Sequence, residues 1–131
     1  MSAFSNYTEA AIVNHFLRAT AQASPSAVYV ALFISDPTEA GSGTEASYTG
    51  YARQSSTWLA LNASGQTKNS GAIVFPANGN ASAAVTVTHA AVFDASASGN
   101  MLIYGPLTTT KTIAVSDVFA VADQQLVLTV N

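Results

Sequence analysis

Apolar and polar positions alternate most regularly in the second half of the chain. Residues 85–93 (VTVTHAAVF) carry an apolar side chain at most second positions, which is the period of a strand with one buried face. The small polar stretch 94–100 (DASASGN) follows and suits a reversal of the chain. Residues 101–107 then return as a second strand, which we expect to end at Pro106, because proline cannot donate to a strand ladder. The pattern predicts a β-hairpin.

The stretch 27–34 (AVYVALFI) is apolar at both alternating sets of positions. This is typical of a central strand covered on both faces, one by the main core and the other by a helix. Further strands are expected at 48–61, 72–75, 108–115, 118–122 and 126–130. The polar stretches 35–47 and 62–70 are expected as loops. About seven to nine short strands with regular turn signals predict a mainly β protein, a single antiparallel β-sandwich or jelly-roll-like domain.

Residues 6–20 carry the helical pattern that completes this fold. Asn6 is the expected N-cap, with Glu9 as its capping-box partner. One apolar stripe at helical spacing comprises Tyr7, Ile12, Val13, Phe16 and Leu17. The sequence therefore divides into an N-terminal helix and linker (1–25) and a β-sandwich (26–131), which together form one structural domain.

Charge is scarce along the whole chain. Of the 131 residues, 49% are hydrophobic and 8% are charged, against about 25% charged in an ordinary soluble domain. Such a surface repels neighbours weakly and suits packing against other subunits. Strand edges with few charges also invite pairing, so we expect a homo-oligomer.

Several classes of function are disfavoured by charge and hydropathy. The net charge is −3 and the four Lys and Arg residues are scattered, whereas nucleic-acid binding requires clustered positive charge. The longest apolar run falls short of the roughly 20 residues that span a bilayer, and the N-terminus lacks the pattern of a signal peptide. We expect neither a nucleic-acid partner nor a membrane partner.

Catalytic motifs are missing as well. Cysteine is absent, and the two histidines, His15 and His89, do not have the spacing of a zinc-binding helix. The sequence contains neither a GxSxG elbow nor a phosphate-binding glycine loop. We expect a protein that is not an enzyme and binds no cofactor or metal. His89 is expected on the face of Val85, Val87 and Phe93, as a hydrogen-bonded core or interface residue.

The candidate contact residues lie on two elements and at one aromatic position. The helix offers its apolar stripe, and the loop 35–47 offers acidic side chains on flexible backbone that orders on binding. Trp58, the sole tryptophan, is a candidate core or interface anchor. The candidate interface set is Ile12, Val13, Phe16, Leu17, Asp36, Glu39, Glu45 and Trp58.

Five stretches in this order resemble a family of small virion proteins of tailed bacteriophages that are labelled tail-fibre or minor tail proteins. They are YVALFISDPTEAGSGTEAS (29–47), GYARQ (50–54), NSGAIVFPA (69–77), VTHAAVFDASASGNMLIYGPLTTTKTI (87–113) and LVLTV (126–130). The resemblance covers most of the chain, and its motifs are structural rather than catalytic. It implies a non-enzymatic virion component, made in the cytoplasm of the bacterial host.

Three functions are compatible with these observations. The favoured one is a tail or baseplate adaptor or short fibre component that contacts other virion proteins and copies of itself. The second is a capsid decoration (cement) protein, which would be present in hundreds of copies per particle rather than tens or fewer. The third is an enzyme, or a carbohydrate-binding module that contacts a host-surface glycan through exposed Tyr48, Tyr51 and Trp58.

Overall fold

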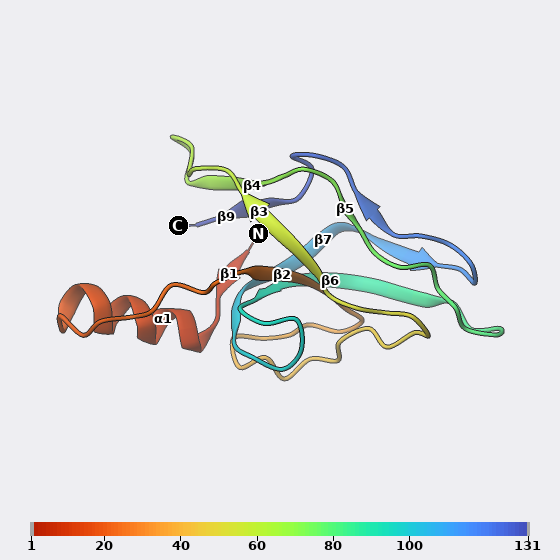
Figure 1. The fold of residues 1–131 in the computed structure, drawn as a ribbon, viewed down its shortest axis with the longest axis horizontal. Coiled ribbons are helices and arrows are strands. Elements are labelled where there is room, and N and C mark those ends of the chain that lie inside the picture. The colour runs from red at the N-terminus through yellow and green to blue at the C-terminus, as the bar shows by residue number, and fades with distance from the viewer. Residues whose placement is uncertain (1, 131) are drawn as a thin grey trace.

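The structure is a computed structural model that describes residues 2–130, and it is mainly β, as predicted (Figure 1). It contains one short α-helix, one π-helical segment and nine strands in the described part of the chain. In chain order these are β1 (Ala3–Phe4), α1 (Asn6–Ile12), η1 (Val13–Leu17), β2 (Val28–Phe33), β3 (Gln54–Trp58), β4 (Gln66–Ser70), β5 (Ile73–Val74), β6 (Val85–Phe93), β7 (Met101–Ile113), β8 (Ala120–Val121) and β9 (Val127–Thr129).

Seven of the strands form one antiparallel sheet that nearly closes into a barrel. Their order is β1-β7-β6-β2-β3-β4-β9, and β5 and β8 form a separate antiparallel pair. The two outer strands of the large sheet approach each other at Ser2 and Thr129. The Thr129 backbone N–H donates to the Ser2 hydroxyl (2.6 Å), which donates to the Thr129 carbonyl (2.8 Å). The prediction of an antiparallel, sandwich-like β fold is confirmed. The segment predicted as helix and linker nevertheless contributes β1 to this sheet.

The predicted hairpin is present as β6 and β7, but its second strand does not end at Pro106. β7 continues to Ile113, so the expected break before residue 108 is wrong. Proline is tolerated because the ladder is irregular there: Val87 pairs with Lys111, whereas His89 pairs with Pro106. An irregular ladder leaves residues without partners, and proline is accepted at such positions.

The same irregularity changes the face on which His89 lies. Val87 is buried in the main core, whereas Ala91 and Phe93 belong to a second cluster. His89 pairs directly with Phe33 of the second cluster, so it shares a face with Phe93, as predicted, but the prediction that it shares this face with Val87 is wrong. A bulge moves every later side chain to the opposite face, because strand periodicity is two residues.

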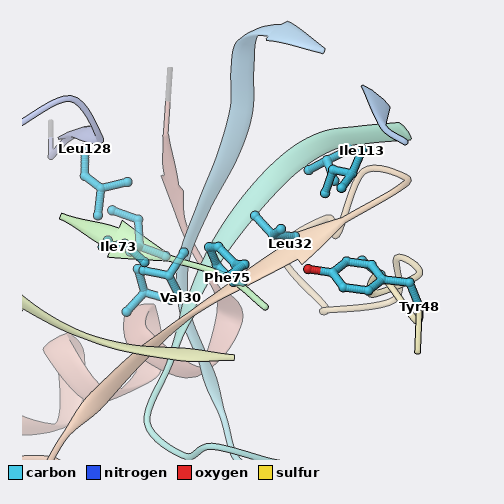
Figure 2. Packing of buried hydrophobic residues seen from close by; sticks show 11 residues of the cluster. Val30, Leu32, Tyr48, Ile73, Phe75, Ile113 and Leu128 are labelled. Carbon is cyan, nitrogen blue, oxygen red and sulfur yellow. The ribbon is translucent and has the colours of Figure 1, made fainter. Parts of the chain in front are cut away.

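β2 is the central strand that its apolar sequence predicted. Val30 and Leu32 point into the main core, where they pack with Phe75 and other buried residues (Figure 2). Ala31 and Phe33 face the second cluster with Phe93. The helix was expected to cover this second face, but α1 has no buried residue. The Arg53 guanidinium lies over the cluster instead, 3.7 Å from the centre of the Phe93 ring.

The polar stretch expected as a loop contains β4, which sequence periodicity did not indicate. β4 pairs with β3 and β9, and its Asn69 is completely buried. The Asn69 side chain donates to the carbonyls of Gly71 (2.8 Å) and Ala122 (3.0 Å), and accepts from the Leu126 N–H (2.8 Å). Buried polar groups of this kind satisfy backbone atoms that no strand partner reaches.

Candidate interface

The first candidate contact element is a helical arm, residues 6–18, that leaves the β body (Figure 1). Its N-cap is Ser5 rather than the expected Asn6, because the Ser5 hydroxyl accepts from the Thr8 N–H (3.2 Å). The same hydroxyl is buried and donates to the Met101 carbonyl of β7. Thr8 also donates from its hydroxyl to the Leu102 carbonyl (2.7 Å). The base of the arm is therefore fixed to the sheet.

The outer half of the arm departs from the predicted α-helix. α1 ends at Ile12, and the five-residue π-helical segment η1 follows, ending at Leu17 rather than at residue 20. The Arg18 N–H donates to the Val13 carbonyl (3.2 Å), which closes the wider turn. π-helical turns recur at functional sites. No helix in residues 2–130 has the length and hydropathy to cross a membrane.

The predicted apolar stripe faces solvent along the arm. Phe16 is 75% exposed and Leu17 is 79% exposed, while Ile12 and Val13 are exposed as well. Figure 1 shows the arm projecting from the β body, with the linker that follows it running back beside it toward β2, and η1 has no buried residue. Contiguous exposed apolar side chains mark an interaction site in a soluble protein. The stripe is the strongest interface candidate in the described residues.

The three acidic side chains of the loop 35–47 differ in exposure, which the sequence did not indicate. Asp36 and Glu39 are exposed, but Glu45 is partly buried and forms a salt bridge with Arg53 (2.8 Å). Backbone hydrogen bonds link Ile34 to Thr44 (2.9 Å) and Ala46 to Leu32 (2.8 Å), which holds both ends of the loop. Glu45 therefore has a structural role within the chain, and two acidic side chains remain available for contacts.

Arg53 joins this loop to the turn of the hairpin. Besides Glu45, it donates from one terminal nitrogen to the carbonyls of Ala95 (3.1 Å) and Ser98 (2.8 Å). Tyr51 completes the cluster by donating its hydroxyl to Glu45 (2.9 Å) while accepting from the Leu32 N–H (3.0 Å). Burial of the Tyr51 hydroxyl raises its pKa above the ordinary value, and the negative charge of the nearby Glu45 carboxylate adds to this effect. The phenol therefore stays protonated.

The aromatic residues considered for sugar binding do not form an exposed platform. Tyr48 is buried and donates its hydroxyl to the Pro76 carbonyl (2.9 Å). Tyr51 is held by Glu45, and Trp58 is partly buried against the main core while its indole N–H donates to Ser56 (3.0 Å). Their ring faces are therefore used within the fold. Trp58 acts as a core anchor on this face.

The two histidines lie in different surroundings: His15 packs edge-on against Phe16, whereas His89 lies near an acidic side chain. His89 shares a hydrogen bond with the Thr88 hydroxyl (2.8 Å), and its other ring nitrogen lies 4.0 Å from Asp36. In the part of the chain that the structure describes, no three His, Asp or Glu residues are placed to hold a metal ion. His89 is hydrogen-bonded and partly buried, as predicted.

One feature that the sequence did not reveal is a groove of about 610 Å³ beside β7. It lies between the second half of β7 and residues 117–125. Val118, on its wall, is 53% exposed. These residues were expected only as strands, because alternation predicts which side chains are buried but does not predict a gap between two strands.

Comparison with known proteins adds one finding. Residues 3–129 match a family model described as Podophage GP4 fiber I protein gp80, which covers nearly the whole chain. No curated protein matches the sequence.

Proposed function

The chain belongs to the family of the podophage GP4 fiber I protein gp80, and from that premise we propose that it is a short fibre element or adaptor of a phage tail. In this proposal the β body is the rigid part, and the apolar arm attaches it to a neighbouring virion subunit. The family supports a phage structural role, in agreement with the resemblance found in the sequence.

The β body has the properties of a rigid spacer. Two outer strands are joined through Ser2 and Thr129, and Arg53 fixes the acidic loop to the hairpin turn. Among the described residues, every buried side-chain nitrogen and oxygen has a hydrogen-bond partner. A body whose buried polar groups are satisfied and whose sheet is nearly closed deforms little when load is applied.

The observation that carries the proposal is the exposure of Phe16 and Leu17 at the end of the arm. Burying a large apolar side chain is worth about 1.5–3 kcal/mol. The two side chains together offer about 3–6 kcal/mol to a partner, a large share of a specific contact. A chain that keeps these residues in water without a partner forgoes that stabilisation.

The test is incorporation of arm variants into the phage particle. The variant combines Phe16→Ser with Leu17→Ser, and the control is Leu61→Ser, because Leu61 is also exposed (57%) and lies in the turn between β3 and β4. Copies per virion are counted by quantitative mass spectrometry against the major capsid protein. We expect tens of copies or fewer for the wild type and the control, and loss of the arm variant from the particle.

Two results would contradict the proposal. Normal incorporation of the arm variant would show that attachment uses another surface. A ratio near one copy per capsid subunit would indicate a capsid decoration protein. Circular dichroism of the purified variants establishes that loss from the particle does not reflect unfolding.

A further inference from the structure

The groove beside β7 is open because two strand edges face it without meeting. The second half of β7 pairs with β6 alone, and β8 pairs with β5 alone, so within residues 2–130 no strand joins β7 to β8. Its lining combines the apolar Leu107, Ile113, Phe119 and Val121 with three threonines, Gln125 and the charged Lys111 and Asp117. Val118 is exposed beside them. The apolar positions of the groove are suited to a partner's apolar side chains, and its polar rim to a partner's charged or polar groups.

We propose that this groove receives the arm of a second copy of the chain, with Phe16 and Leu17 as the inserted side chains. The inference rests on the proposed function, in which the arm is the attachment element, and it names the partner. Phe16 and Leu17 are the most exposed large apolar side chains in residues 2–130. The groove has a volume of about 610 Å³. One chain therefore carries both an apolar projection and an apolar recess.

The two surfaces lie at opposite ends of the molecule. Figure 1 shows the arm at one end, and β7 with the blue segment that follows it at the other. The arm is anchored at its base through Ser5, so it cannot fold back across the body to fill its own groove. Contact between them is possible only between molecules.

Charge supports a match between the arm and the groove. Asp117 and Lys111 line the groove, and neither takes part in an ion pair within the described chain. Arg18 directly follows Phe16 and Leu17, so it can pair with Asp117 when they insert. The carbonyls at the end of a helix carry partial negative charge, which favours a cation such as Lys111 nearby.

An interface between different surfaces of identical chains is heterologous. Each copy retains a free arm at one end and a free groove at the other, so addition continues until a ring closes or a filament forms. This separates the proposal from a two-fold dimer in which two arms pack against each other. A heterologous contact predicts that two different defects compensate when the variants are mixed.

The experiment is sedimentation velocity of the purified full chain as wild type, as an arm variant and as a groove variant. The arm variant carries Phe16→Ser and Leu17→Ser, the groove variant carries Val118→Glu, and Leu61→Glu is the matched surface control. We expect concentration-dependent oligomers for the wild type and control. Each variant alone should associate at least about 10-fold more weakly, the effect of losing one large apolar contact.

A mixture of the two variants provides the decisive result. The intact groove of the arm variant should bind the intact arm of the groove variant, which gives a 1:1 dimer and nothing larger. A second measurement uses charge: Arg18→Asp and Asp117→Arg should each weaken association alone, and mixing them should restore oligomers in which the two variants alternate, because both contacts between unlike variants pair opposite charges. Self-association of the groove variant at the wild-type level would overturn the proposal, as would a mixture that stays monomeric.

The outcome also separates this inference from the proposed function. If the wild type is monomeric well above micromolar concentration while the arm variant is still lost from virions, the arm binds a different protein and the self-docking proposal is wrong. If the arm variant enters virions normally, the proposed function itself fails.

Discussion

Replacing Asn69 with alanine tests how the polar strand β4 holds the C-terminal part of the chain. The side chain is 0% exposed and makes three hydrogen bonds: two donated to backbone carbonyls and one accepted from a backbone N–H. Each hydrogen bond contributes about 0.5–1.5 kcal/mol net, and a buried donor or acceptor that is left without a partner costs about as much or more. Asn69→Ala should therefore destabilise the fold by about 3 kcal/mol, a large share of the roughly 5–15 kcal/mol of a typical domain.

Urea unfolding followed by Trp58 fluorescence measures this loss. Trp58 is the sole tryptophan and pairs directly with Asn69 across β3 and β4, so it reports on the affected region. At an m-value of about 2 kcal/mol/M, the midpoint should fall by about 1.5 M. Asn6→Ala is the control, because Asn6 is exposed, and its midpoint should change by less than about 0.3 M. A midpoint for Asn69→Ala within that same range would show that these three hydrogen bonds contribute little to stability.

Three further predictions concern the hairpin turn and its attachment. Arg53→Lys keeps the charge but loses the planar two-nitrogen contact with Glu45, so urea unfolding should show a loss of about 2 kcal/mol. Gly99→Ala should cost about 1–2 kcal/mol by the same assay, because φ is +73° and an added Cβ would lie 2.5 Å from Asp94; an unchanged midpoint would show that the turn adapts. Burial acts to raise the pKa of Asp94, but hydrogen bonds from Asn100 and the charge of Arg53 outweigh it and hold the pKa below the ordinary 3.8. Ionised Asp94 therefore adds stability above that ordinary value, and this contribution is lost as the pH falls through the lowered one. Unfolding midpoints measured against pH should show a smaller loss in that acid range for Asp94→Asn than for the wild type, and equal losses would contradict the assignment.

The strands that could be predicted are those whose burial is indicated by the residues of the strand itself. β6 alternates apolar and polar residues, and β2 is apolar at every position, so their positions follow from a two-residue period and a buried location. The turn between β6 and β7 was identified for the same reason, because Gly99 tolerates positive φ. Such features depend on neighbours along the chain.

Features that depend on a distant partner were missed. Asn69 is polar and lies in a stretch typical of a loop, and its burial becomes favourable when Ala122 and Leu126 from the end of the chain supply hydrogen-bond partners. Pro106 predicts the end of a strand, but the irregular pairing with β6 allows β7 to continue through it. Ser5 is a better cap than Asn6 because its hydroxyl also reaches Met101 of β7, a contact that no local pattern contains.

The β class, the central hairpin and the apolar stripe of the arm follow from the order of the residues alone, as does the lack of catalytic motifs. The tertiary structure decided that the stripe stays in solvent, that Glu45 is bound by Arg53, and that a groove opens beside β7. The physical reason is that periodicity specifies which side chains favour burial. What buries them, or leaves them free for a partner, depends on how distant segments pack.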